Sequence, residues 1–244
     1  MEEEIKGLTK TTIFPDLENV ALRLITDECD LFYARERDLP EHWNGSLPWW
    51  AFVWPGGYGT AAFLFRNRNH SIVSKIERGS CRVVDFACGC GVGATAALKV
   101  GATDVLAIDI CPYATKVTEM NVEMNDLPVD RLSTLTENVI GTAVGDVVRP
   151  DDVVLCGDVL YDDAFARDLI PWVQYLASNG VTVIVGDPGR WVLNEMSDRR
   201  RGELLRFEAE IALSESLQKS NHGITAASLY SVLPRSDILH NYNH

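Results

Sequence analysis

The sequence predicts an α/β fold with a mostly parallel, doubly wound sheet, and three observations support this. Between residues 81 and 185, short runs rich in valine and isoleucine alternate with stretches of helical pattern, as in right-handed strand–helix–strand units. A glycine-rich turn follows the first of these runs, at 85–93. Near the end of the chain, two segments resemble half-exposed strands, which fit an antiparallel hairpin at the edge of the sheet.

Size and charge limit the classes of function. The 244 residues, 46% of them hydrophobic, are enough for one sizeable core. The formal net charge is -13 and no basic patch is visible, so we expect no nucleic-acid partner. The acidic balance either favours a basic partner, such as a lysine-rich protein surface, or serves solubility alone. No apolar run reaches the roughly 18 residues of a membrane span, so we expect no membrane partner.

The six cysteines do not form a recognisable metal site. Cys88 and Cys90 are too close for the usual ligand pair, and no spacing resembles a zinc ribbon. We therefore expect no metal, and we expect small buried thiols in a reducing compartment.

Residues 1–45 are expected to form an N-terminal extension, followed by a single domain over 46–244. Within the extension, apolar residues recur at helical spacing over 17–25, which predicts a short amphipathic helix. A dense aromatic patch follows at 49–54 and ends in a Pro-Gly-Gly sequence. The pattern after it predicts a helix over 58–66.

In the regular part of the chain, predicted strands alternate with predicted helices. The strands are expected at 81–86, 104–109, 132–136, 152–156 and 181–185, and the helices at 92–100, 112–125 and 163–178. Two later strands are expected at 204–214 and 226–233. Together these elements predict a seven-stranded sheet that is mostly parallel, with the late pair as its antiparallel edge hairpin.

The most informative feature is the turn after the first predicted strand. Asp85 lies at the end of that strand, Gly89 and Gly91 follow in the turn, and Asp109 ends the second strand. A strand, a glycine turn, a helix and a second strand ending in an acid form a unit that holds an adenosine-containing cofactor. A carboxylate ahead of the glycines suits a cation better than a diphosphate. This order favours S-adenosylmethionine (SAM), which carries a sulfonium and an amino group.

Several motifs together carry a family resemblance. They are the aromatic segment 49–57, the turn 85–91, the Asp-Val-Leu-Tyr sequence at 158–161 and the Gly-Asp-Pro-Gly-Arg sequence at 186–190. With them, the chain resembles the class I, seven-stranded SAM-dependent methyltransferases, which have a Rossmann-like fold. More narrowly, it is similar to the protein lysine methyltransferases with an Asp/Glu-x-x-Tyr motif, and in particular to the electron transfer flavoprotein beta-subunit lysine methyltransferases. The C-terminal third carries no motif that we can match.

The resemblance implies a set of cofactor contacts. Asp85 would lie by the methionine part of SAM, or else cap the following helix, while Gly89 and Gly91 would let backbone and ligand approach. The other implied contacts are Asp109 with the ribose, Ile110 against the adenine, Asn138 with the adenine amino group and Trp54 as a wall of the pocket. For Asn138 and Trp54, a polar loop residue and plain aromatic packing are the alternatives.

Asp158 and Tyr161 are the implied catalytic residues. Free lysine has a pKa near 10.4 and is mostly protonated at neutral pH, whereas only the neutral amine can attack a methyl carbon. Asp158 would position the incoming ammonium and Tyr161 would aim the lone pair; alternatively, Asp158 caps the helix near 163 and Tyr161 only packs. Asp187 and Arg190 would shape the far wall of the substrate cleft, or form a rigid turn only.

We therefore expect a monomeric SAM-dependent protein-lysine N-methyltransferase that releases S-adenosylhomocysteine, with the electron transfer flavoprotein beta subunit as the acceptor that the resemblance implies. The alternatives are a class I methyltransferase of another protein or a small molecule, a non-enzymatic member that binds SAM or a partner, and an NAD-linked Rossmann oxidoreductase. The last predicts a Gly-x-Gly-x-x-Gly turn and a hydride-relay pair, and neither is evident. The resemblance implies the mitochondrial matrix, but the acidic start at 1–4 shows no transit peptide, so the cytoplasm is the other expectation.

Overall fold

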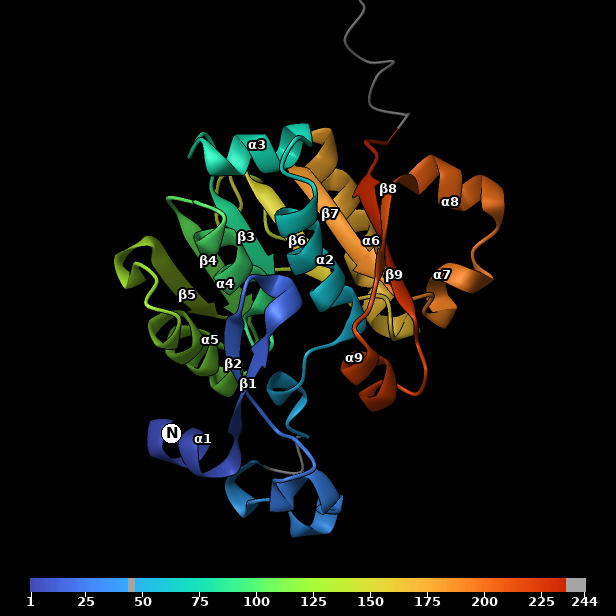
Figure 1. Cartoon of the computed structure of the whole chain (residues 1–244). Coiled ribbons are helices and arrows are strands. Elements are labelled where there is room, and N and C mark those ends of the chain that lie inside the picture. Colours follow the sequence, from blue (N-terminus) through green and yellow to red (C-terminus); the bar gives the residue numbers. More distant parts are fainter. Residues whose placement is uncertain (44–46, 236–244) are drawn as a thin grey trace, which may run out of the picture.

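Seven strands form the central sheet of the computed structural model, which describes residues 1–43 and 47–235 (Figure 1). Their spatial order is β5-β4-β3-β6-β7-β9-β8. The five parallel strands are β3 (Val83–Phe86), β4 (Val105–Asp109), β5 (Leu132–Thr136), β6 (Val153–Gly157) and β7 (Thr182–Asp187). The predicted α/β class is confirmed, and so are these five strands, each within about two residues of its expected bounds.

Different helices cover the two faces of the sheet. In β3, Val83 belongs to one buried cluster and Val84 to the other, so consecutive side chains point to opposite faces. Figure 1 shows α2 (Pro55–Arg66), α4 (Val92–Lys99) and α5 (Pro112–Met124) in front of the sheet and α6 (Asp163–Ser178) behind it. Because both faces are covered, the strands read as nearly continuous apolar runs. The predicted helices in these four places are confirmed.

The late hairpin is also confirmed. Strand β9 (Ala226–Val232) lies between β7 and β8 (Leu205–Ala212) and is antiparallel to both. Five helices of the described chain were not expected: α1 (Glu2–Leu8), α3 (Ser71–Glu77), α7 (Trp191–Glu195), α8 (Asp198–Leu204) and α9 (Glu215–Ser220). Each has seven residues or fewer, which is too short for a helical period to stand out in the sequence.

The predicted helix over 17–25 is wrong, because this part of the chain contains the second strand of a hairpin. The elements here are α1 (Glu2–Leu8), β1 (Lys10–Phe14), a 3-10 turn (Pro15–Leu17) and β2 (Val20–Leu24). In β2, Val20, Leu22 and Leu24 are buried and the residues between them are half-buried, which is a period of two. Over so short a stretch the apolar residues fit either period, and pairing with β1 decides between them.

Two asparagine side chains, one on α5 and one directly after it, hold this hairpin. Asn125 Oδ1 accepts a hydrogen bond from Ala21 N at 2.9 Å, and Asn125 Nδ2 donates to Ala21 O at 2.7 Å. Asn121 Oδ1 accepts a bond from Arg23 N at 2.8 Å. Backbone groups of β2 are thereby satisfied by amide side chains instead of a further strand. The expected boundary between extension and domain, at residues 45 and 46, lies outside the described residues.

The remaining regular elements are short 3-10 turns. They are Asp30–Tyr33, Glu36–Asp38, Glu41–Trp43, Trp49–Ala51 and Val129–Arg131. Within the described ranges, none of the helices has the length and apolarity that crossing a membrane would require.

The first turn of α2 touches the carboxyl ends of β6 and β7. A Cβ atom on Gly56 would lie 2.2 Å from Gly186 O and 2.5 Å from Asp158 N. A Cβ atom on Gly186 would lie 2.4 Å from Gly56 O, and one on Gly157 would lie 2.5 Å from Gly57 Cα. The missing side chains therefore permit a backbone-to-backbone approach that any larger residue would block. This contact sets where α2 begins relative to the edge of the sheet.

Gly56→Ala should destabilise the fold strongly, because its Cβ would overlap backbone atoms that cannot rotate away. We expect a loss of about 3 kcal/mol or more in the free energy of unfolding. Gly57→Ala is the matched control, since its Cβ would meet only Val92 Cγ1 at an ordinary 3.5 Å. Urea unfolding followed by circular dichroism measures both, and equal losses in the two variants would contradict the close-approach argument.

Candidate active site

Four aspartates gather at the carboxyl ends of four adjacent parallel strands. Asp85 is next to last in β3, Asp109 and Asp187 end β4 and β7, and Asp158 directly follows β6. The chain reverses its direction across the sheet between β3 and β6, and open α/β sheets bind ligands at such a place. Among the described residues, Arg190 is the one basic side chain in an ion pair with any of the four. The edge therefore favours a ligand that carries positive charge.

Asp85 is a buried carboxylate without a cationic partner in the described chain. It is 5% exposed, and its Oδ2 accepts a hydrogen bond from Ala94 N at 2.7 Å, in the first turn of α4. Burial raises the pKa of Asp85 to about 7, and the charge of Asp109 adds to that increase. The capping contact considered as an alternative is therefore present. A cationic ligand group would relieve the remaining cost of burying this charge.

Asp109 holds the glycine turn and has capacity left for a ligand. Its Oδ2 accepts a hydrogen bond from Gly89 N at 3.0 Å, and its Oδ1 accepts one from Cys111 N at 2.9 Å. Burial raises the pKa of Asp109. Each carboxylate oxygen can accept two bonds, so one site on each oxygen is left for a pair of hydroxyl groups. The neighbouring Ile110 is 74% exposed and offers an apolar surface beside that carboxylate.

The glycines of the turn serve different purposes. Gly91 has φ +71°, and a Cβ there would lie 2.4 Å from Thr118 Oγ1 on α5, so its small size permits packing within the fold. Gly89 has φ +52°, but a Cβ there would have no atom within 4 Å. The space next to Gly89 is open, which suits the approach of a ligand to the backbone.

Trp54 and Asn138 lie in contacts of their own. Trp54 immediately precedes α2, and its Nε1–H donates to Trp49 O at 3.0 Å. Its ring also packs against Trp49 and Phe52, with centroids 5.7 and 6.0 Å apart. Asn138 is exposed, and its Oδ1 accepts a bond from Ile140 N at 3.1 Å. Trp54 thus packs among aromatic rings, and Asn138 is a polar loop residue, as the two alternatives state. Neither set of contacts prevents the side chain from also touching a ligand.

Asp158 is held from two sides. It is 7% exposed and has φ +62°. Its Oδ2 accepts a hydrogen bond from Gly56 N at 2.7 Å, and its Oδ1 accepts one from Arg190 Nε at 2.5 Å. Asp158 thus caps the first turn of α2. The alternative in which it caps α6 is wrong, because Asp162 Oδ1 accepts the bond from Phe165 N at 2.8 Å and caps that helix.

Tyr161 and Asp187 differ in their access to solvent. Tyr161 is 59% exposed and stacks on Phe165, with ring centroids 5.7 Å apart. Asp187 is fully buried, and its Oδ1 accepts bonds from Gly189 N and Arg190 N, each at 2.7 Å. Burial raises the pKa of Asp187, and the charge of Asp158 contributes. Asp187 therefore shapes the turn that carries Arg190. Of these two residues, Asp187 is buried and Arg190 is half-exposed.

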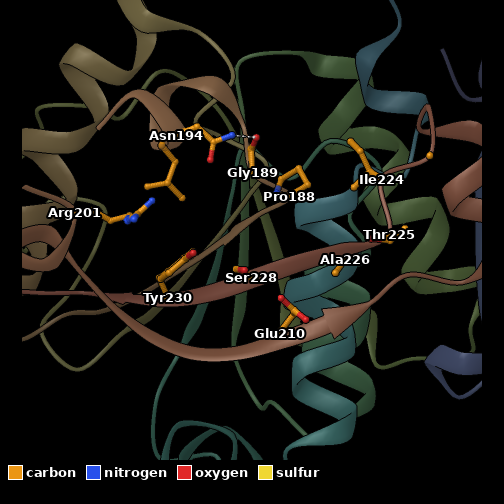
Figure 2. A pocket seen from close by; sticks show the side chains of 12 residues that line it. Pro188, Gly189, Asn194, Arg201, Glu210, Ile224, Thr225, Ala226, Ser228 and Tyr230 are labelled. Carbon is orange, nitrogen blue, oxygen red and sulfur yellow. Dashed lines mark hydrogen bonds between the residues drawn. The ribbon is translucent and has the colours of Figure 1, made fainter. Parts of the chain in front are cut away.

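A cavity of about 420 Å³ adjoins the same turn (Figure 2). Pro188 and Gly189 line it together with residues of α7, α8, β8 and β9, and Asn194 Nδ2 donates to Gly189 O at 2.8 Å. None of the residues proposed for the cofactor lines this cavity. In the part of the chain that the structure describes, no group of three or more histidine, cysteine or acidic side chains is arranged to hold a metal.

Sequence patterns did not predict two contacts of this site. One is the hydrogen bond from Gly56 N to Asp158. The Pro-Gly-Gly sequence after the aromatic patch could have indicated a close backbone approach at this point, but not its partner. The other is the ion pair between Asp158 and Arg190. These two residues are 32 positions apart in the chain, and no pattern in a single sequence pairs them.

Comparison with known proteins relates the chain to methyltransferases. The family model of ribosomal protein L11 methyltransferase (PrmA) matches residues 70–164, which include the glycine turn and Asp158. The fold also matches the crystal structure of a proposed RNA methyltransferase from Pyrococcus horikoshii with a TM-score of 0.51, at 13% identity, over 78% of this chain and 90% of that one. The strand order and the fold match give the seven-stranded, Rossmann-like class, and the matching family model is that of a methyltransferase.

Whole-length relatives define the family more narrowly. The chain is 36% identical to the electron transfer flavoprotein beta subunit lysine methyltransferase of Xenopus laevis, over 93% of this chain and 84% of that protein. It is 31% identical to the human protein of the same name, over 96% of this chain and 81% of that protein. The chain belongs to the electron transfer flavoprotein beta subunit lysine methyltransferase family.

Asp85→Asn should change how the free energy of unfolding depends on pH. The pKa of Asp85 is raised from 3.8 to about 7, so the native state binds its proton more tightly than the unfolded state. The contribution of Asp85 to wild-type stability should therefore fall as the pH rises from about 4 to about 7. Asparagine can still accept the hydrogen bond from Ala94 N, and it carries no charge. Over that pH range, the free energy of unfolding of the variant should therefore rise relative to that of the wild type by on the order of a few kcal/mol.

Urea unfolding of both proteins at about pH 5 and about pH 8 measures this difference. The same difference in unfolding free energy at both pH values would show that the Asp85 carboxylate is not destabilised by burial.

Proposed function

We propose that this methyltransferase transfers methyl groups from SAM to lysine side chains of the electron transfer flavoprotein beta subunit and releases S-adenosylhomocysteine. The observation that carries the proposal is similarity along nearly the whole chain to relatives named for that reaction and that acceptor. The row of aspartates at the sheet edge supports it, because both the donor and a lysine ammonium are cations. The proposed compartment is the mitochondrial matrix, in keeping with that acceptor.

The residues at β3 and β4 fit SAM. When bound, SAM supplies an electrophilic methyl group on a positively charged sulfur. Asp109 would accept hydrogen bonds from the two ribose hydroxyls with its remaining acceptor sites, and Ile110 would cover the adenine. Asp85, whose buried charge has no basic partner in the described chain, would hold the amino group of the methionine part. The open space at Gly89 leaves room for the ligand.

The residues after β6 would handle the acceptor. Methyl transfer requires a neutral amine that lies in line with the S–CH3 bond, in a site that excludes water. Tyr161, with its exposed ring, would orient the nitrogen lone pair. Trp54 would form a wall of the donor pocket, and Asp158, directly after β6, would orient the lysine. The net charge of -13 supports a basic surface on the acceptor.

Transfer of radiolabelled methyl groups from SAM tests the function directly. We expect label in the beta subunit of recombinant electron transfer flavoprotein, on lysine residues located by mass spectrometry, because the relatives are named for this acceptor. Ribosomal protein L11 is the control acceptor, since the matched family model carries its name. Label in L11 and none in the flavoprotein would contradict the acceptor assignment but leave the enzyme class intact.

Asp109→Asn should weaken SAM binding by about 10- to 100-fold, because it replaces charge-assisted hydrogen bonds to the ribose with neutral ones. Asp104→Asn is the matched control: it removes the same charge just before the other end of β4, at an exposed position. Titration calorimetry with SAM measures both, and NAD should not bind to either protein. If Asp109→Asn binds SAM as tightly as the control does, Asp109 has no ribose contact.

A further inference from the structure

The carboxylate of Asp158 is already paired with donors of the chain itself in this structure. Arg190 Nε lies 2.5 Å from Asp158 Oδ1, and Gly56 N lies 2.7 Å from Asp158 Oδ2. The side chain of Asp158 is 4% exposed and that of Arg190 is 27% exposed. Both carboxylate oxygens therefore bind donors of the chain itself, and the ion pair as a whole carries no net charge.

Net charge at this place controls how reactive a lysine would be. Only the neutral amine attacks, and free lysine has a pKa near 10.4. An unpaired carboxylate within about 4–6 Å would stabilise the ammonium form and raise that pKa by roughly 1–3 units. Each unit would lower the neutral fraction of the amine about tenfold at neutral pH. An arginine in the pair offsets this effect, because a guanidinium keeps its charge throughout the working pH range.

We propose that Arg190 is a positioning residue that neutralises Asp158, so that the acceptor lysine meets a neutral ion pair and reacts as a neutral amine at physiological pH. This inference rests on the proposed function. The lysine ammonium would give its proton to water, and the nitrogen lone pair left behind would form the new N–C bond as the S–CH3 bond breaks. The electron pair of the broken bond would stay on sulfur, so that S-adenosylhomocysteine leaves. Asp158 then orients the amine through hydrogen bonding and not through charge.

The fold holds Arg190 in this position from several sides. Its backbone N–H and that of Gly189 donate to Asp187 Oδ1, each at 2.7 Å. Its guanidinium carbon lies 5.8 Å from the ring centroid of Trp54, within the range of a cation–π contact. Helix α7 begins at the next residue. The guanidinium is thus placed between Asp158 and the aromatic residue proposed as a wall of the donor pocket.

The other titratable groups around the pair are acidic. Asp187 lies at the end of β7, and its pKa is raised by burial and also by Asp158. Tyr161 follows β6, and its pKa is raised by burial and also by the charges of Asp162 and Asp109. Among the described residues, only Arg190 forms an ion pair with Asp158. Removing Arg190 therefore leaves Asp158 and Asp187 without a basic partner among the described residues, and the pKa of a bound lysine should move upward.

The test is the pH dependence of single-turnover methyl transfer to the flavoprotein beta subunit, with SAM and acceptor saturating. Under these conditions the rise of the rate with pH reports the pKa of the bound lysine. We expect Arg190→Met to move this rise upward by about 1–3 pH units, so that the rate near pH 7 falls at least about tenfold and recovers at high pH. Arg190→Lys keeps the charge and should leave the rise in its wild-type position.

Asp158→Asn combined with Arg190→Met is the decisive control, because it restores a neutral pair without either charge. The transfer rate of the double variant should rise at the same pH as that of the wild type, even if its maximal rate is lower. A purely structural role of Arg190 would not restore that pH. Thermal unfolding and SAM calorimetry check that each variant is folded and saturated. An unmoved rise in Arg190→Met, or a double variant that follows Arg190→Met, overturns the inference while the function stands. Absence of transfer by the wild type at every pH overturns the proposed function and this inference with it.

Discussion

The contact between the first turn of α2 and the ends of β6 and β7 determines the arrangement of the candidate site. Glycines at 56, 157 and 186 let three backbone segments touch, and the Gly56 N–H then donates to Asp158. The N-terminus of a helix carries partial positive charge, so a buried carboxylate is stabilised there. The same contact places Trp54, directly before α2, beside Arg190. One backbone approach thus brings together residues from three distant parts of the chain.

Electrostatics gives this arrangement its chemical character. Four carboxylates lie along one edge of the sheet, with one guanidinium in an ion pair among the described residues. Burial and mutual repulsion raise the pKa of Asp85 and Asp187, since neighbouring aspartates contribute to both increases. A site of this kind stores unfavourable energy that a cationic ligand relieves on binding. Where a carboxylate is instead paired with arginine, as at Asp158, the local charge suits a neutral amine.

The sequence predicted elements well where they are long or buried on both faces. The five parallel strands and the helices α4, α5 and α6 have strong apolar patterns, and their bounds differ little from those expected. Prediction failed for β2 and for the helices of seven residues or fewer, where pairing and packing outweigh local pattern. The same holds for the candidate site. The order of strands and turns was enough to find the acids at the strand ends, but not the hydrogen-bond and ion-pair partners of those acids.

By itself, the sequence determined the alternation of strands and helices, the glycine turn between two acids, and the motifs that carry the family resemblance. These are local properties, because each depends on residues a few positions apart. Only the tertiary structure decided that Asp158 caps α2 and not α6, that Arg190 is its ion-pair partner, and that Asp187 is buried within a turn. The two contacts of Asp158 join residues 102 and 32 positions apart, and they form only when the parallel strands align their carboxyl ends at one edge.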